Sequence, residues 1–168
     1  IQYKDGIVKE HIDTRQSAGF FDVSHMGQLF VSGEKSLEES LEKIIPLDFE
    51  EIKKNQSKYS FLINDQGGII DDLIITRIEG GFNIILNAAC KDNDIKEIAK
   101  CLMPENKYEL RKDLSLIALQ GPKSESILES IVAGIKKLKF MNGDYFKFKG
   151  KQVYITRSGY TGEDGFEI

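Results

Sequence analysis

Apolar residues recur at helical spacing in several stretches of this chain. Val8 and Ile12 lie four positions apart in an otherwise polar run, which predicts a short surface helix over residues 8–17. The same kind of spacing predicts further helices: one that starts at Ser32 or Gly33 and ends before Pro46, one capped by Asp92 to Asp94 that stops before Pro104, and one that begins at Pro122.

Other stretches alternate apolar and polar residues or concentrate branched and aromatic side chains, which favours strands. The clearest is residues 59–89, where such runs are separated by turns at 65–68 and 79–81 and predict a three-stranded antiparallel meander. Further strands are predicted over 20–31, 114–120 and 145–157, and after a glycine-containing loop. Because helices and strands arrive in mixed groups, we expect an α+β fold with largely antiparallel sheets, hairpins and a few flanking helices.

Composition supports a folded globular chain and narrows its partners. The 168 residues are 40% hydrophobic and 30% charged, enough chain to bury roughly 70% of its unfolded surface. The net charge of -4 argues against nucleic acid as the main partner. No apolar run approaches the roughly 20 residues of a membrane-spanning helix, so no membrane partner is expected. Cys90 and Cys101, with two histidines, show no metal-ligand spacing and fit a reducing compartment.

The two ends of the sequence suggest a piece of a longer protein. The chain starts at Ile1 without a methionine or a signal-like segment, and it stops at Ile168 within a strand-like run. No linker divides the residues between these ends. We therefore expect a single domain over residues 1–168, truncated relative to the whole protein.

Asp71 and Asp72 interrupt the apolar second strand of the meander. Aspartate has low strand propensity, and burial of an unpaired carboxylate is costly, so stability alone does not explain the pair. Neighbours on a strand face opposite sides, so we expect no carboxylate dyad and at most one catalytic residue. The alternative is that both are solvated on a sheet edge, near the turn at Gly67 and Gly68.

The loop SGYTGEDGFE, residues 158–167, is rich in glycine but has the wrong charge for a phosphate loop. Its carboxylates predict recognition of hydrogen-bond donors instead. A carboxylate there can accept paired N–H bonds from a planar heterocycle while Tyr160 supplies an aromatic face. The alternative is an acidic turn leading into a structural strand.

Three other features are given simpler interpretations. Ser24 and His25 are adjacent in an extended segment and would point apart, so a hydrolase triad is not supported. We interpret His25 as a hydrogen-bonded structural residue and Cys90 as a small buried apolar residue. The basic cluster near residues 136–151 is interpreted as a solvated strand face that protects a sheet edge, or as a docking site for an acidic partner. We call its alternating members the hairpin lysines: Lys147, Lys149 and Lys151.

Taken in order, several segments resemble the glycine cleavage system T-protein family of aminomethyltransferases. These are FDVSHMGQ at 21–28, KYSFLINDQGGIIDDLI at 58–74, ILNAACKDND at 85–94, LIALQGPKSE at 116–125 and TRSGYTGEDGFEI at 156–168. The resemblance covers nearly the whole chain and implies most of the N-terminal folate-binding region. It also implies that further pocket residues lie downstream of Ile168, so we expect weak folate binding and little turnover from these residues alone.

The resemblance implies transfer of the methylene of an aminomethyl group, carried on the lipoyl arm of the H-protein, to tetrahydrofolate with release of ammonia. It implies that Asp71 is the catalytic carboxylate, supported by Asp72, and that no metal takes part. The folate-binding residues that it implies are Met26, Tyr59, Asn87, Tyr160 and Glu167. Location would be cytoplasmic, or the mitochondrial matrix in a eukaryote.

Two other classes of function stay open at this point. One is another folate-dependent one-carbon enzyme of the same superfamily, such as a demethylase or the folate domain of a sarcosine or dimethylglycine dehydrogenase. The other is a non-catalytic folate-binding protein, which would have no need of Asp71. A structural domain without a ligand is a further alternative, but it would leave both Asp71 and the acidic loop unexplained.

Overall fold

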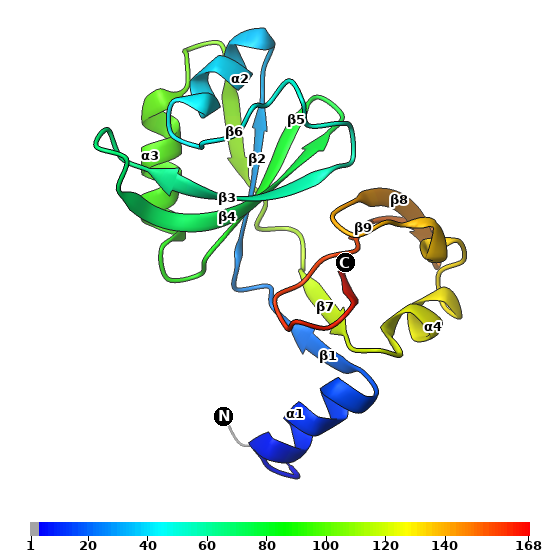
Figure 1. Cartoon of the computed structure of the whole chain (residues 1–168). Coiled ribbons are helices and arrows are strands. Elements are labelled where there is room, and N and C mark those ends of the chain that lie inside the picture. Colours follow the sequence, from blue (N-terminus) through cyan, green and yellow to red (C-terminus); the bar gives the residue numbers. More distant parts are fainter. Residues whose placement is uncertain (1–3) are drawn as a thin grey trace. The chain divides into compact units, whose positions relative to one another are not determined.

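A computed structural model describes residues 4–168, and contacts between residues divide the chain into two compact units (Figure 1). The meander unit is His25–Leu114, and the terminal unit combines residues 4–24 with Ser115–Ile168. The meander unit is therefore an insertion, in sequence, between two parts of the terminal unit. That the units belong to a single domain stays a prediction.

The meander unit contains a five-stranded antiparallel sheet in the order β3-β4-β5-β2-β6. Its consecutive strands β3, β4 and β5 pair as neighbours, so the predicted meander is confirmed. Strand β6, which pairs with β2, has no counterpart among the predicted strands. The elements of this unit are β2 (Gly27–Ser32), α2 (Lys35–Glu42), β3 (Ser57–Ile63), β4 (Ile69–Ile78), β5 (Gly81–Leu86), α3 (Lys91–Cys101) and β6 (Lys107–Leu110).

One apolar cluster joins the sheet of the meander unit to both of its helices. Leu41 from α2 and Ile98 from α3 are fully buried in it together with Leu73, Ile75 and Phe82 from the strands. Alternate residues of a strand share one face, so the core side of β4 is the side of Leu73 and Ile75. Asp71, two residues before Leu73, falls on this same side.

The terminal unit contains a second five-stranded antiparallel sheet, in the order β1-β7-β10-β9-β8. Leu119, Leu128, Ile155 and Phe166 are buried in its separate apolar cluster. The hairpin lysines lie in the β8–β9 hairpin, whose strand β8 is at the edge of the sheet, as predicted. The elements are α1 (Ile7–Gln16), β1 (Gly19–Asp22), β7 (Ile117–Gln120), α4 (Ser124–Glu129), the 3-10 helix η1 (Ile135–Lys137), β8 (Gly143–Phe148), β9 (Lys151–Thr156) and β10 (Gly165–Glu167).

The fold class is confirmed, whereas two predicted helix caps are wrong. Helix α2 has Glu34 at its N-cap instead of Ser32 or Gly33, and α3 has Cys90 instead of Asp92 to Asp94. The cause in α3 is a backbone turn that starts earlier: the N–H groups of Cys90 and Lys91 both donate to the Asn87 carbonyl oxygen. Asp94 therefore lies inside the first turn of α3, fully buried, instead of capping it.

Within residues 4–168 the longest and most apolar helices fall short of what crossing a bilayer requires.

Candidate functional site

A bulge in β4 precedes Asp71. The register pairs Ile69 with Ile63 and Asp71 with Leu62, which leaves Ile70 without an opposite residue. Asp71 follows this bulge on the core side of the sheet and is half-buried. Asp72 faces the other side, as strand alternation predicts.

Asn87, the residue after β5, reaches both aspartates. Its Nδ2 donates to Asp71 Oδ1 over 3.0 Å and to Asp72 Oδ1 over 2.6 Å, and it also lies 3.3 Å from the Asp72 carbonyl oxygen. One amide thus links two carboxyl groups on opposite sides of the strand. The expectation that the two aspartates face opposite sides did not include this link, because the link depends on how β4 and β5 pair.

Tyr59 fixes the outer carboxyl group. Its hydroxyl donates to Asp72 Oδ2 over 2.8 Å, and this hydrogen bond raises the pKa of Tyr59. Tyr59 and Asp72 come from the paired strands β3 and β4, with Tyr59 two positions from the residue opposite Asp72. Tyr59 is 49% exposed, and its ring packs edge-on against Phe61. Tyr59 therefore offers an accessible aromatic surface beside a carboxylate.

Asp71 has a second carboxyl neighbour in Asp94 of α3. Burial raises the pKa of Asp71, but hydrogen bonding from the Asn87 side chain, the Asp72 backbone, Asp94 and Cys90 outweighs it, so the pKa lies below its usual value. Burial and the adjacent Asp71 raise the pKa of Asp94 to about 7. Two carboxyl groups with pKa values pushed in opposite directions are typical of functional sites.

Cys90 lies beside the same carboxyl groups. The negative charge of Asp71 and partial burial raise the pKa of its thiol, so the thiol stays protonated at neutral pH. Sequence interpretation assigned Cys90 no role and gave Asp94 only a capping role. The signal that could have found Asp94 is its position seven residues after Asn87, at the start of the helix that follows the meander.

Met26 and its neighbours precede β2. Met26 is half-buried at a bend, and Ser24 Oγ donates to Asp22 Oδ1 over 2.6 Å. The exposed His25 makes a backbone contact, in which its carbonyl oxygen accepts from Lys91 Nζ over 3.1 Å. The side chain of Ser24 is therefore engaged by a carboxylate, in keeping with the rejection of a hydrolase triad.

In the terminal unit, the buried Gln120 organises the acidic loop. Its Nε2 donates to the Ser158 carbonyl oxygen over 2.9 Å, and its Oε1 accepts from Thr161 Oγ1 over 2.8 Å. The loop passes so close that a Cβ atom on Gly159 would lie 2.1 Å from Gln120 Oε1, and one on Gly165 would lie 2.5 Å from Gln120 Cδ. These two glycines serve close packing on Gln120 rather than a phosphate cradle.

Two carboxylates of this loop are held in ion pairs. Asp164 pairs with Arg157, whose hydrogen bonds lower the pKa of the Asp164 carboxyl group. Glu163 pairs with Arg15 of α1 over 2.9 Å. Arg157 is also paired with Glu125 over 2.9 Å. Two of the acidic side chains of this loop, Glu163 and Asp164, therefore have a structural role as partners of arginines.

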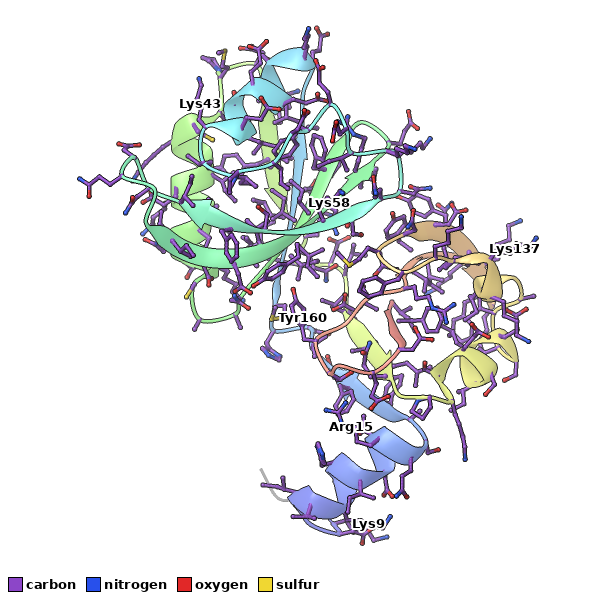
Figure 2. The ribbon with its side chains drawn as sticks, in the orientation of Figure 1. Lys9, Arg15, Lys43, Lys58, Lys137 and Tyr160 are labelled. Atoms are coloured by element: carbon purple, nitrogen blue, oxygen red, sulfur yellow. The ribbon has the colours of Figure 1, made fainter. Side chains whose placement is uncertain are left out.

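Glu167 differs from the other acidic residues of this segment because it contacts a hydroxyl group. Ser158 Oγ donates to Glu167 Oε2 over 2.5 Å, and Thr156 Oγ1 lies 2.7 Å from Ser158 Oγ. Burial raises the pKa of Glu167, partly offset by the Ser158 hydrogen bond. Tyr160 lies on the loop between β9 and β10 (Figure 2). It is 57% exposed. Glu167 and Tyr160 belong to the same loop-and-strand segment. That they bind one ligand together stays a prediction.

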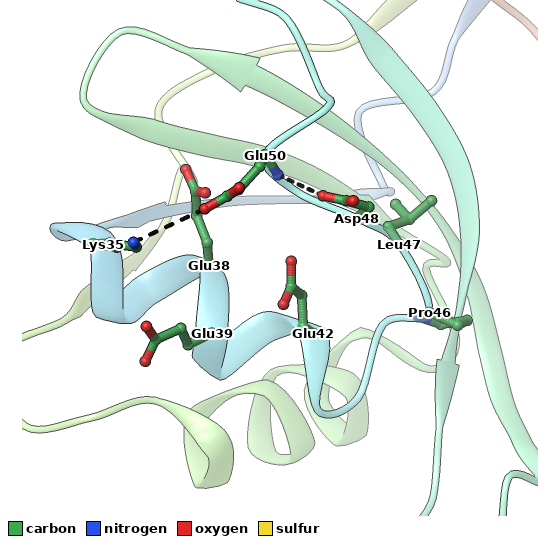
Figure 3. Close-up of a pocket in the computed structure, with 8 residues that line it drawn as sticks. All are labelled: Lys35, Glu38, Glu39, Glu42, Pro46, Leu47, Asp48 and Glu50. Carbon is green, nitrogen blue, oxygen red and sulfur yellow. Dashed lines mark hydrogen bonds and ion pairs between the residues drawn. The ribbon is translucent and has the colours of Figure 1, made fainter.

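A pocket of the meander unit lies elsewhere, between α2 and the segment that follows it (Figure 3). Glu38, Glu39 and Glu42 line it, and Lys35 lies 4.0 Å from Glu50 across it. None of the predicted site residues borders this pocket, and its excess of carboxylates does not suit an anionic ligand. Among residues 4–168, no group of three or more histidine, cysteine, aspartate or glutamate side chains is placed to hold a metal ion.

The model of the GCVT N-terminal domain family matches residues 1–168. The chain belongs to this family. Among curated family relatives, the mitochondrial aminomethyltransferase of Dictyostelium discoideum is 42% identical over 100% of this chain and 44% of its own length. An aminomethyltransferase of Clostridium botulinum is 38% identical over 99% of the chain and 46% of its own length. The chain thus spans about half the length of the curated relatives it matches.

Solved structures support the fold. The glycine cleavage system aminomethyltransferase T from Bartonella henselae has a TM-score of 0.88 and 41% identity, covering 99% of this chain and 45% of that one. A heterotetrameric sarcosine oxidase from Corynebacterium has a TM-score of 0.60 at 11% identity, covering 89% of this chain and 73% of that one, and so shows a related fold alone. The match to the family identifies no functional residue of this chain.

Proposed function

We propose that this chain is the N-terminal part of a tetrahydrofolate-dependent aminomethyltransferase of the glycine cleavage system. The observation that carries the proposal is the half-buried carboxylate of Asp71, whose pKa is held below its usual value. It lies within a β-strand, where aspartate is uncommon. Family membership and relatives named aminomethyltransferase support the reaction class. The superfamily alternatives rest on no separate observation.

Asp71 is the proposed catalytic carboxylate. An ionised carboxylate in a partly desolvated place stabilises positive charge that develops nearby and can orient an attacking nitrogen through its N–H group. The Asn87 amide, bonded to Oδ1, restricts rotation of the Asp71 side chain. Asp72, held by Tyr59 and Asn87, is the supporting neighbour rather than a second acid or base.

The folate-binding roles are proposed separately within each unit. In the meander unit the proposed groups are the thioether of Met26, the exposed ring of Tyr59, which is hydrogen-bonded to Asp72, and the amide of Asn87, which is hydrogen-bonded to Asp71. In the terminal unit, the Glu167 carboxylate is proposed to accept N–H bonds from the pterin edge, with Tyr160 against its face. Glu167 suits this role because Ser158 occupies only part of its accepting capacity.

Titration of the purified chain with tetrahydrofolate tests this proposal. Isothermal calorimetry should give saturable binding that Glu167→Gln weakens at least tenfold, because the amide replaces an accepting oxygen by a donor. Glu163→Gln is the matched control, since Glu163 is paired with Arg15 and should leave binding within twofold. Equal affinities for the two variants would reject the Glu167 role, and no binding at millimolar ligand would reject the folate proposal for this chain.

The catalytic role of Asp71 is tested by transfer itself. Because little turnover is expected from this chain alone, the substitutions are made in the whole enzyme of which it is proposed to be the N-terminal part. With aminomethyl-loaded H-protein and tetrahydrofolate, ammonia release by that enzyme should fall by at least a hundredfold in Asp71→Ala and far less in Asp72→Ala. A transfer rate for Asp71→Ala within a few-fold of the unchanged protein would remove Asp71 from the catalytic role. The lipoylated H-protein is the proposed protein partner. The proposed compartment is the cytoplasm in a bacterium or the mitochondrion in a eukaryote, the latter as in the name of the Dictyostelium discoideum relative.

A further inference from the structure

Asp94 is a fully buried carboxyl group that the proposed reaction does not use. Its residue is 0% exposed, and neither of its oxygens has a hydrogen-bond partner of ordinary length and angle within residues 4–168. Burial of an ionised, unpaired carboxylate is among the most costly arrangements in a protein. Either the group carries no charge or an unusual interaction offsets the cost.

One carboxyl oxygen of Asp71 also lacks an ordinary hydrogen-bond partner in the described part of the chain. Asp71 Oδ1 accepts from Asn87, but Asp71 Oδ2 is buried and lacks an ordinary partner within residues 4–168. The side chains of Asp71 and Asp94 interact, and the interaction lowers the pKa of Asp71 and raises that of Asp94. Two ionised carboxylates only accept hydrogen bonds, so a single proton between them supplies a partner for Asp71 Oδ2 and engages one of the two Asp94 oxygens.

We propose that Asp94 keeps its carboxyl proton and donates it in a hydrogen bond to Asp71 Oδ2, so that Asp94 is a positioning residue for the Asp71 carboxylate. This inference rests on the proposed catalytic role of Asp71. With Asn87 on Oδ1 and Asp94 on Oδ2, the carboxylate is held from both sides. The pair then carries one negative charge and one proton, and the charge stays on Asp71.

The surroundings of Asp94 explain which partner keeps the proton. Ile98, one turn further along α3, is fully buried in the apolar cluster, so the helix presses Asp94 toward the core. Asp71 is half-buried and receives the Asn87 amide, whereas Asp94 receives only a weaker contact from Asn93, which lowers its pKa slightly against the effect of burial. The other titratable groups at this place are Asp72 and the protonated thiol of Cys90.

NMR of the chain labelled with carbon-13 at the aspartate carboxyl carbon tests the proton's position without folate. One aspartate should titrate about 3 pH units above the exposed ones, and its signal should vanish in Asp94→Asn. In Asp71→Asn the signal of Asp94 should titrate at lower pH, because the neighbouring charge is gone. Titration of Asp94 together with the exposed aspartates would overturn the proposal.

Positioning is separated from mere burial by comparing two replacements. Asp94→Asn retains an N–H donor and should leave the pKa of Asp71 below the usual value of 3.8, whereas Asp94→Leu has no donor and should raise it. Asp92→Leu, exposed in the same helical turn, is the control and should change neither. If Asp94→Leu folds and the pKa of Asp71 is unchanged in it, the proposal is contradicted. If Asp94→Leu does not fold, the proposal is contradicted by an Asp71 pKa in Asp94→Asn that is no longer below its usual value.

The two proposals fail in different ways. If tetrahydrofolate does not bind but Asp94 titrates as expected, the folate proposal falls and the shared proton stands. If tetrahydrofolate binds and Glu167→Gln weakens it, but Asp94 titrates with the exposed aspartates, only the positioning role falls.

Discussion

The buried proton on Asp94 makes the stability of the meander unit depend on pH in a direction opposite to that of most carboxyl groups. Its pKa rises from 3.8 to about 7 on folding, because of burial and of Asp71. A tenfold change in an acid dissociation constant corresponds to about 1.4 kcal/mol, so this rise in pKa corresponds to ~4 kcal/mol. The native state binds more protons than the unfolded state between these values, so this stabilisation is complete below pH 4 and is lost as the pH rises to 7.

Asp94→Asn isolates this contribution because asparagine is uncharged throughout. The free energy of unfolding of the unchanged chain minus that of the variant should fall by ~4 kcal/mol between pH 4 and pH 7 and be constant above pH 8. Urea denaturation at each pH, followed through the amide NMR signals of β4 and β5, measures it in the meander unit. The same subtraction for the exposed Asp92→Asn should be nearly flat.

A difference between the unchanged chain and Asp94→Asn that varies by less than ~1 kcal/mol across this pH range would refute the reasoning, since it would place the native pKa of Asp94 near its unfolded value. A difference that rises with pH would show that the buried group is stabilised as a carboxylate. That result would exclude the donated hydrogen bond to Asp71.

Other perturbations test the packing and the surface. Phe82→Ala should cost about 3–5 kcal/mol in urea denaturation, because Phe82 is 1% exposed and packs edge-on against Phe49 at 5.0 Å; a cost below ~1 kcal/mol would contradict its place in the core. Gly159→Ala should lower the melting temperature more than Gly67→Ala, because the added Cβ meets Gln120 at 2.1 Å whereas at Gly67 it meets open space. Replacing the hairpin lysines by glutamine should slow association with an acidic partner protein and flatten its dependence on salt in stopped-flow measurements; unchanged rates would leave them as edge protection.

Much of the fold could be predicted from local patterns. The meander is confirmed because its strands are adjacent in the chain, are separated by short turns and pair with their nearest neighbours. The first helix is confirmed at Ile7–Gln16. Strand β6 was missed because its four residues are mostly exposed and depend on β2, far away in sequence, for their pairing. The division of the chain into two units at Ser24 and Ser115 could not be predicted, because no change in amino-acid composition accompanies it.

The sequence by itself determined the α+β class, the family resemblance and the two unusual features, a carboxylate within an apolar strand and an acidic glycine loop. Only the tertiary structure decided which carboxyl groups do what. Asp164 and Glu163 are neutralised by arginines, Glu167 meets a hydroxyl group, and Asp94 turns inward to Asp71. The reason is physical: periodicity reports which side of a strand or helix is apolar, but a carboxyl group's charge depends on burial and on partners that are brought close only by folding.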